Sequence, residues 1–160
     1  MTSPADLETN INPFTAFNFK VELYEQGTNT QLCSAGFADC DGLEMVIEPK
    51  TIRQGGENGR QRHFVGPVSY GQLTLKRGMT ANFDLWRWFA RTMETRGSSL
   101  RASGLVVMLA GDGSTEQVSF ELEGCLPIKL KAPTLSAKDG LIAVEEMQIA
   151  YELMKLKEPL

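Results

Sequence analysis

The sequence has 160 residues, of which 42% are hydrophobic and 22% charged, a composition typical of one globular domain. The formal net charge of −4 argues against a dedicated, sequence-specific nucleic-acid-binding protein. The longest apolar run, 105–110, is too short to span a membrane, and the N-terminus lacks the features of a secretory signal. We therefore expect synthesis and assembly in the cytoplasm, without stable membrane insertion by this chain.

Residues suited to catalysis or metal binding are scarce. His63 is the only histidine, and Cys33, Cys40 and Cys125 lack the close spacing of metal ligands, so we interpret them as free thiols of a reducing compartment. The segment 67–71 lacks the first glycine of a nucleophile elbow. We expect no enzyme activity, no catalytic, cofactor-binding or metal site, and no cofactor.

The glycine-rich segment 55–59 does not match a phosphate-binding loop. Such a loop continues into Gly-Lys-Ser/Thr and a helix, or follows a strand as Gly-x-Gly-x-x-Gly. This segment instead runs into basic residues, and 48–62 contains four basic residues and two acidic ones. We interpret the stretch from residue 54 to about 67 as a flexible basic loop that contacts an acidic protein surface.

The first half of the sequence predicts an N-terminal arm followed by strands. Residues 1–13 are polar and predict an N-terminal arm, and 14–160 predict a single domain. Alternation from Phe17 to Tyr24 predicts a half-buried strand, and 34–53 predicts an extended region interrupted at Asp41-Gly42 and at Pro49. Alternation over 70–76 predicts another strand.

One helix is expected, over about 83–95, with Thr80 or Asn82 as its cap. Its wide apolar face predicts that the helix plugs one face of a sheet. The core anchors expected on that face are Trp86, Phe89 and Met93.

The second half predicts a hairpin of 105–110 with 118–122, and a short strand over 126–132. The last segment, 141–155, is ambiguous from its pattern alone. As a strand it groups Met147, Ile149, Tyr151 and Leu153 on one face; as a helix it groups Val144, Met147, Tyr151 and Met154. Pattern favours the strand only slightly.

Six segments in this order resemble the tail-tube family of contractile phage tails and phage-tail-like extracellular contractile injection systems, and more distantly the type VI secretion ring protein. The segments are 36–43, the Gly55-Gly56 loop, Leu-Thr-Leu-Lys-Arg-Gly at 73–78, Leu-Trp-Arg-Trp at 85–88, Leu-Pro-Ile-Lys at 126–129 and Val-Glu-Glu at 144–146. The resemblance covers about residues 14–155.

The resemblance implies a mainly β, sandwich-like or barrel-like subunit with one α-helix, which closes into a hexameric ring with a continuous inner β-barrel. Rings would stack head to tail into a rigid tube that a contracting sheath drives through a target envelope to deliver cargo. The implied partners are further copies of the chain, the sheath, spike and baseplate proteins, a tube terminator, and a cargo or tape-measure protein in the lumen. The final segment would then be a strand.

Two sets of residues are candidates for assembly. The long loop between 51 and 68 is the expected ring-stacking contact, through Arg53, Gly55, Gly56, Asn58, Arg60 and Arg62. The polar face of the last strand is the expected lumen wall, through Glu146, Gln148 and Glu152, which would make that wall negative. The competing interpretation places those three side chains on the outer face, against the sheath.

Two other functions remain open at this point. The first is a tube-initiator or baseplate-adaptor ring of the same fold. The second, from a different class, is a small ligand-binding β-barrel, which would be monomeric and would need an apolar cavity. The sequence also leaves open whether the particle is a phage or an injection system, and whether its cargo is DNA or protein.

Overall fold

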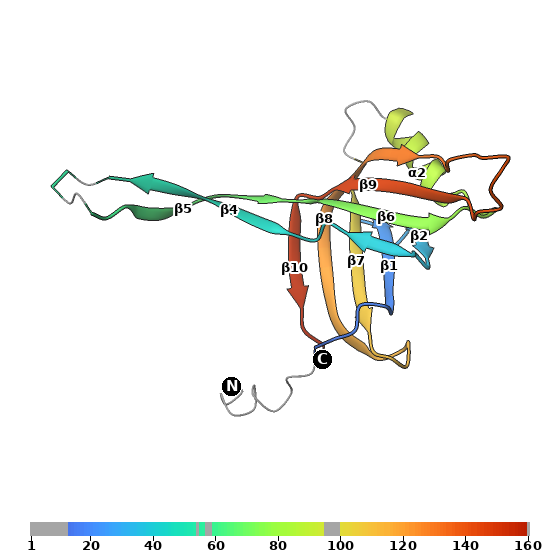
Figure 1. Ribbon diagram of the computed structural model, residues 1–160, viewed down its shortest axis with the longest axis horizontal. Coiled ribbons are helices and arrows are strands. Elements are labelled where there is room, and N and C mark those ends of the chain that lie inside the picture. Colours follow the sequence, from blue (N-terminus) through green and yellow to red (C-terminus); the bar gives the residue numbers. More distant parts are fainter. Residues whose placement is uncertain (1–12, 54, 57–58, 95–99, 160) are drawn as a thin grey trace.

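Two layers of antiparallel strands form the body of the protein, and a long two-stranded ribbon projects from it (Figure 1). The computed structural model describes residues 13–53, 55–56, 59–94 and 100–159. The elements are β1 (Phe19–Glu25), β2 (Gln31–Ala35), β3 (Asp39–Asp41), β4 (Met45–Ile52), β5 (Arg62–Tyr70), β6 (Gln72–Gly78), α2 (Asp84–Glu94), β7 (Ala102–Leu109), β8 (Glu116–Lys131), β9 (Val144–Ala150) and β10 (Leu153–Lys157). The predicted mainly β fold with one helix is confirmed for this part of the chain.

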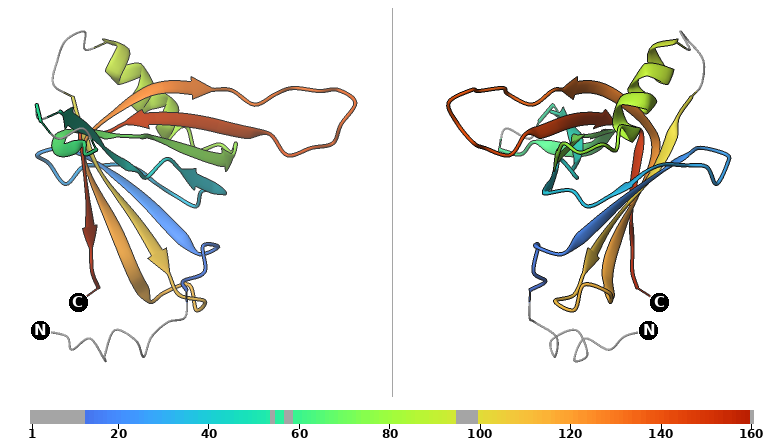
Figure 2. Two further views of the ribbon diagram at one scale, coloured as in Figure 1. Left: turned by 60° about the vertical axis from the view of Figure 1, so that its left-hand side comes forward. Right: turned by 90° about the vertical axis from the view of Figure 1, so that its right-hand side faces the viewer.

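Strand β8 belongs to both layers. The strands pair in the order β2-β1-β7-β8-β9-β6-β3, and β10 also pairs with β8. The N-terminal part of β8 pairs with β7 and β10, whereas Leu126–Lys131 pairs with β9. The two further views in Figure 2 show the layers diverging from this shared strand. One layer is therefore β2-β1-β7-β8-β10, and the other is β3-β6-β9-β8.

The sequence predicted two strands where the structure has the single strand β8. Gly124 adopts a φ of +67°, which only glycine tolerates well, and the register shifts between Pro127 and Lys129. These two irregularities bend the strand without ending it. Pro127 sits at the register shift, where the regular ladder is already interrupted.

The core lies between the layers and is built from the alternating apolar positions of the strands. Fully buried side chains come from β1, β6, β8 and β9 and from the helix; they include Leu23, Leu73, Leu75, Leu122, Met147, Ile149 and Trp88. The predicted strand of the last segment is confirmed as β9. Phe17, predicted as the first alternating residue of the first strand, precedes β1 and is 69% exposed.

The helix prediction is confirmed, with bounds Asp84–Glu94. Asn82 supports its start, because its Oδ1 accepts a hydrogen bond of 3.2 Å from the backbone N–H of Asp84. The Thr80 hydroxyl accepts from the N–H of Asn82 instead. None of the helices in the described ranges is long and apolar enough to cross a membrane.

Candidate assembly surfaces

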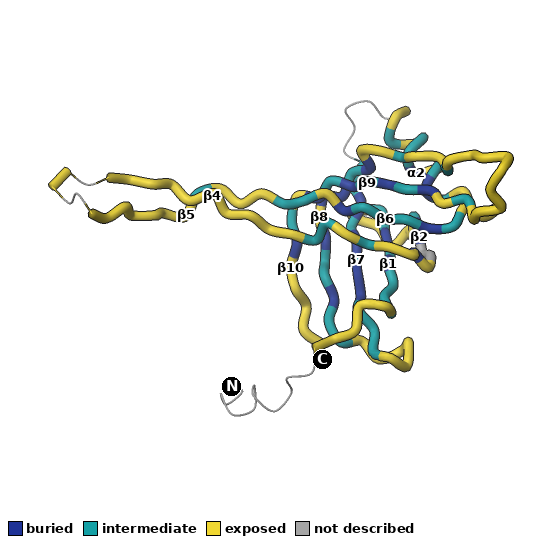
Figure 3. Tube along the Cα trace, in the orientation of Figure 1, coloured by how far each residue is buried: buried dark blue, intermediate teal, exposed yellow. Residues whose placement is uncertain are grey.

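Strands β4 and β5 form a two-stranded ribbon that extends well beyond the body of the subunit (Figure 3). The sequence predicted a loop from residue 54 to about 67, but Arg62–Tyr70 is a strand paired with Met45–Ile52. The loop prediction is therefore wrong for this part. The prediction failed because the ribbon has no buried face, so its strands show no alternation of apolar and polar residues.

Large apolar side chains on the ribbon are exposed. They are Met45, Val46, Ile47, Ile52, Phe64, Val65 and Val68, with exposed fractions between 48% and 81%. A two-stranded hairpin alone is at best marginally stable in water. Exposed apolar surface of this extent marks a site of protein association.

The root of the ribbon is fixed to the body by Tyr151, which follows β9. Its buried hydroxyl donates a hydrogen bond of 2.7 Å to the carbonyl oxygen of Gly42 and accepts one of 3.1 Å from the N–H of Glu44. The Tyr151 ring also packs against Tyr70, with ring centroids 5.7 Å apart. A Cβ at Gly42 would lie 1.8 Å from the carbonyl oxygen of Gln72, and the φ of Gly42 is +96°, so this close crossing requires glycine.

The predicted stacking residues lie at the free end of this ribbon. Arg53, Gly55, Gly56, Arg60 and Arg62 are all exposed, and Arg62 is the first residue of β5. Asn58 lies outside the described residues. The structure thus brings five of the six predicted residues to one tip, far from the core.

The layer β3-β6-β9-β8 presents an uncovered polar face. Glu146 and Gln148 of β9 lie on this face, as expected for the predicted lumen wall, because their neighbours Met147 and Ile149 are fully buried. The register places Lys76 of β6 and Lys131 of β8 on either side of Glu146. Along the described strands of this layer, the charged residues on this face are Asp39, Asp41, Lys76, Lys129, Lys131 and Glu146.

Those six charges balance, three acidic against three basic. The expectation of a negative wall is therefore wrong for this face, because the neighbouring strands supply the lysines. Glu152 does not share the face at all. It lies between β9 and β10, where the chain crosses to the other layer, and its carboxylate is 3.5 Å from Arg101 Nε.

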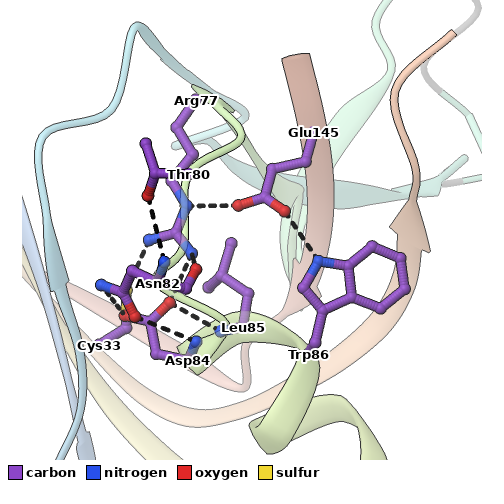
Figure 4. Close-up of polar contacts among 8 residues, drawn as sticks. All are labelled: Cys33, Arg77, Thr80, Asn82, Asp84, Leu85, Trp86 and Glu145. Carbon is purple, nitrogen blue, oxygen red and sulfur yellow. Dashed lines mark hydrogen bonds and ion pairs between the residues drawn. The ribbon is translucent and has the colours of Figure 1, made fainter. Parts of the chain in front are cut away.

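A buried ionic network joins the helix to this same layer (Figure 4). Arg77 of β6 is 5% exposed and Glu145 of β9 is 1% exposed. Arg77 Nε donates to Glu145 Oε1 at 2.5 Å, and Arg77 also donates to Asp84 Oδ1, at the start of the helix, at 2.5 Å. Glu145 Oε2 accepts a bond of 2.8 Å from Trp86 Nε1. The four side chains therefore tie β6, β9 and α2 together.

The charge state of the network follows from its geometry. Burial alone would lower the pKa of Arg77, but its hydrogen bonds to Asp84 and Glu145 raise that pKa above its ordinary value. The guanidinium carbon also lies 5.6 Å from the centre of the Phe37 ring. Arg77 is thus a permanently charged group within the core, and the carboxylates of Asp84 and Glu145 accept its hydrogen bonds and balance its charge.

The helix anchors differ from those predicted. Leu85 and Trp88 are the buried residues of the helix, Phe89 is partly buried against the core, and Met93 is 61% exposed. Trp86 is partly exposed and is held by its hydrogen bond to Glu145. At about 100° per residue, Trp86 and Met93 lie roughly 80–100° from the direction of Leu85, at the margin of the buried stripe. The prediction of Met93 as an anchor is wrong for the single subunit.

The three cysteines are free thiols, as predicted. Burial raises the pKa of Cys33 and of Cys125 to about 12, and the pKa of Cys40 to about 11. All three thiols are therefore protonated at neutral pH and behave as small apolar side chains.

The fold and its surfaces define a class of protein. The uncovered ribbon, the open charged face and the rigidly attached helix make a β-rich structural subunit built to associate with other proteins. The chain belongs to the family described as the T4-like virus tail tube protein gp19, whose model matches residues 15–155. It is a structural protein of the tube and baseplate type and not an enzyme, and its recognition as a tail-tube protein from the sequence is confirmed.

Solved structures share this fold. A chain of the anti-feeding prophage (AFP) baseplate, solved with six-fold symmetrisation, has a TM-score of 0.81 at 22% identity, covering 92% of this chain and 97% of its own. A chain of the PVC sheath–tube complex, an extracellular contractile injection system in its extended state, has a TM-score of 0.77 at 16% identity, covering 99% and 100%. Hcp1 from Salmonella typhimurium is more distant, with a TM-score of 0.51 at 13% identity, covering 88% and 87%. The chain has no match among curated proteins.

Proposed function

We propose that copies of this chain close into hexameric rings, and that the rings stack head to tail into the hollow inner tube of a contractile tail-like particle. The family assignment and the likeness to chains of a sheath–tube complex and a six-fold symmetrised baseplate support this proposal. The tube would serve as a conduit for cargo when a surrounding sheath contracts. Spike, baseplate and terminator proteins, and a cargo or tape-measure protein in the lumen, are its further partners.

The observation that carries the proposal is the exposed apolar ribbon β4–β5. A ribbon of this length with both faces open requires a neighbouring molecule to cover it. The connection between β8 and β9, residues 132–143, projects from the opposite end of the subunit (Figure 1). It carries the exposed side chains Leu135, Leu141 and Ile142, each more than 80% exposed.

The two ends of the subunit are therefore different surfaces. A contact between unlike surfaces is heterologous and, when it does not close, repeats without limit along an axis. This is the geometry that a stack of identical rings requires. We assign the ribbon tip, with Arg53, Arg60 and Arg62, to the contact with the adjoining ring.

The polar face of β3-β6-β9-β8 is assigned to the lumen. A sheet whose inner face packs on the core and whose outer face is polar suits a wall that is dry on one side and wet on the other. Its charges balance, so the wall would neither attract nor repel a polyanion strongly. Glu146 and Gln148 belong to this wall, and Glu152 does not.

A second candidate is a ring that joins the tube to the baseplate, favoured by the TM-score of 0.81 to the AFP baseplate chain. Such a protein would form single rings instead of long stacks. Electron microscopy of the purified protein distinguishes the two, because a tube protein should form stacks of many rings.

The test of stacking is the double substitution Arg60→Glu with Arg62→Glu. We expect this variant to form rings of normal mass by analytical ultracentrifugation and to lose long stacks in micrographs. The matched control, Arg87→Glu with Lys155→Glu, makes the same charge change on exposed positions away from the ribbon and should stack normally. A wild-type protein that remains monomeric at high concentration would refute the proposed function itself.

A further inference from the structure

The two edges of the layer β3-β6-β9-β8 carry opposite charges. Asp39 and Asp41 lie on β3 at one edge, and Lys129 and Lys131 lie on β8 at the other. All four side chains are exposed and point to the uncovered face. Among the ion pairs of the described residues, none involves any of these four side chains.

The charges of this face are arranged in rows across the strands. Asp39 lies opposite Lys76, Lys76 opposite Glu146, and Glu146 opposite Lys131. This row alternates in sign from one edge to the other. The next row runs from Asp41 through Thr74 and Gln148 to Lys129, so it also begins with an acid and ends with a base.

The strand directions allow the two edges to meet. This layer has four strands, and each strand is antiparallel to its neighbours in the layer. An even number of alternating strands leaves the two edge strands pointing in opposite directions. When copies are related by rotation about a ring axis, β3 of one copy therefore lies antiparallel to β8 of the next, and the ladder can continue across the junction.

Where neighbouring copies of this chain meet in the proposed ring, we propose that the charges of these two edges set the register of the junction: Asp39 beside Lys131 of the neighbouring copy, and Asp41 beside Lys129 of that copy. This inference rests on the proposed ring. The antiparallel direction makes the two pairs compatible, because residue numbers rise along β3 as they fall along β8. The pairing turns each short row into an alternating row that runs on into the next subunit.

The pairs also explain how the edges avoid wrong partners. An edge strand exposes unpaired backbone groups, and opposite charges across a strand pair stabilise it while like charges destabilise it. Two β3 edges would bring acids together, and two β8 edges would bring lysines together. Only the junction of unlike edges satisfies the charges, which favours ring closure over association of two copies by the same edge.

The test uses two variants: each should form no rings alone, and the two should form rings when they are mixed. The first is Lys129→Glu with Lys131→Glu, which makes both edges acidic. The second is Asp39→Lys with Asp41→Lys, which makes both edges basic. We expect each variant to be folded by circular dichroism and to lose rings by native mass spectrometry at low salt.

An equal mixture of the two variants should restore rings, because every junction between unlike variants again joins acids to lysines. The restored rings should contain the two variants in equal numbers, alternating around an even-membered ring. The quadruple variant should also form rings by itself. A control with the same charge change off these two edges, Arg87→Glu with Lys155→Glu, should form rings as the wild type does.

Each other result overturns the inference. If either edge variant alone forms rings as the wild type does, or if the mixture forms none although the wild type does, the charges do not set the junction. If the control loses rings as the edge variants do, net charge is responsible. These outcomes leave the proposed ring intact, whereas a wild type without rings refutes the proposed function.

Discussion

The hydroxyl of Tyr151 donates a hydrogen bond of 2.7 Å to the carbonyl oxygen of Gly42, a residue 109 positions earlier in the chain. The same hydroxyl accepts from the N–H of Glu44, so one side chain satisfies two backbone groups where the ribbon leaves the body. Tyr151 is 6% exposed, so its hydroxyl bonds to these backbone groups from a buried side chain. The position of the ribbon therefore depends on this residue.

Tyr151→Phe should lower the free energy of unfolding by about 0.5–1.5 kcal/mol, because it removes the hydrogen bonds of the hydroxyl to Gly42 and Glu44. It should also speed amide hydrogen exchange at the base of the ribbon, around Met45 and Tyr70. Urea denaturation and hydrogen exchange measure the two effects. Tyr24→Phe is the control, because within the described part of the chain the Tyr24 hydroxyl bonds to the half-buried Glu22 side chain, and its loss should change stability by less than about 0.5 kcal/mol.

Glu145→Gln should destabilise the protein by about 3–5 kcal/mol, because it leaves the buried Arg77 without one of its two carboxylates. The fluorescence of Trp86 should change as well, since its indole N–H bonds to Glu145. Thermal unfolding followed by fluorescence measures both. Glu146→Gln is the matched control on the opposite face of β9, and equal destabilisation by the two changes would contradict the assigned role of the network.

Gly66→Ala should distort the ribbon and reduce stacking of rings. A Cβ at Gly66 would lie 1.8 Å from the carbonyl oxygen of Glu48 on the paired strand, so one strand must move. Gly111→Ala, between β7 and β8, is the control away from the ribbon, where an added Cβ meets nothing within 4 Å. Stack length in electron micrographs should fall for Gly66→Ala and stay normal for Gly111→Ala. Unchanged stacks in both would show that the ribbon shape does not matter for assembly.

The buried thiols predict an alkaline loss of stability. The pKa of Cys33 and of Cys125 is about 12 in the folded protein against an ordinary 9.0, so the unfolded chain releases these protons first. Stability is then fully present below about pH 9 and falls as pH rises toward 12, by at most about 1.4 kcal/mol per pH unit for each thiol. Urea titrations between pH 8 and 10.5 should show a shallower fall for Cys33→Ala with Cys125→Ala. An identical slope in that variant would exclude the thiols as the cause.

A cysteine at Gln148 tests the lumen assignment. In a Cys40→Ala background, the remaining natural thiols are buried and protonated, so a bulky thiol reagent should react only at position 148. We expect slow labelling in assembled, capped tubes and fast labelling of the disassembled subunit. Equal rates in the two states would place this face outside the lumen.

Much of the fold could be predicted because burial repeats with the period of the element. Leu73 and Leu75 of β6, and Met147 and Ile149 of β9, alternate with polar residues and are fully buried. The Asp84–Glu94 helix was predicted for the same reason. The ribbon could not be predicted, because neither of its faces is buried in the subunit and the pairing of Met45–Ile52 with Arg62–Tyr70 leaves no periodic signal.

The buried network was missed, although the alternation contains a signal for it. Arg77 continues the every-second-residue series of Leu73 and Leu75 that faces the core, and Glu145 begins the same kind of series that continues with Met147 and Ile149. Charged residues at core-facing positions of two strands predict an ion pair between the strands. Glu152 was predicted on the same face as Glu146 and Gln148, but the break between β9 and β10 interrupts the alternation of side chains at this point. The sequence pattern does not reveal that break.

The shared strand β8 has a mechanical consequence. Because one continuous peptide backbone runs through both layers, a push on one layer reaches the other through covalent bonds instead of through side-chain packing alone. Sliding the layers apart along this seam would break hydrogen bonds of β8 with β7, β9 and β10 together. The shared strand should therefore make the subunit resist bending between its two layers, because the angle between the layers is fixed along β8.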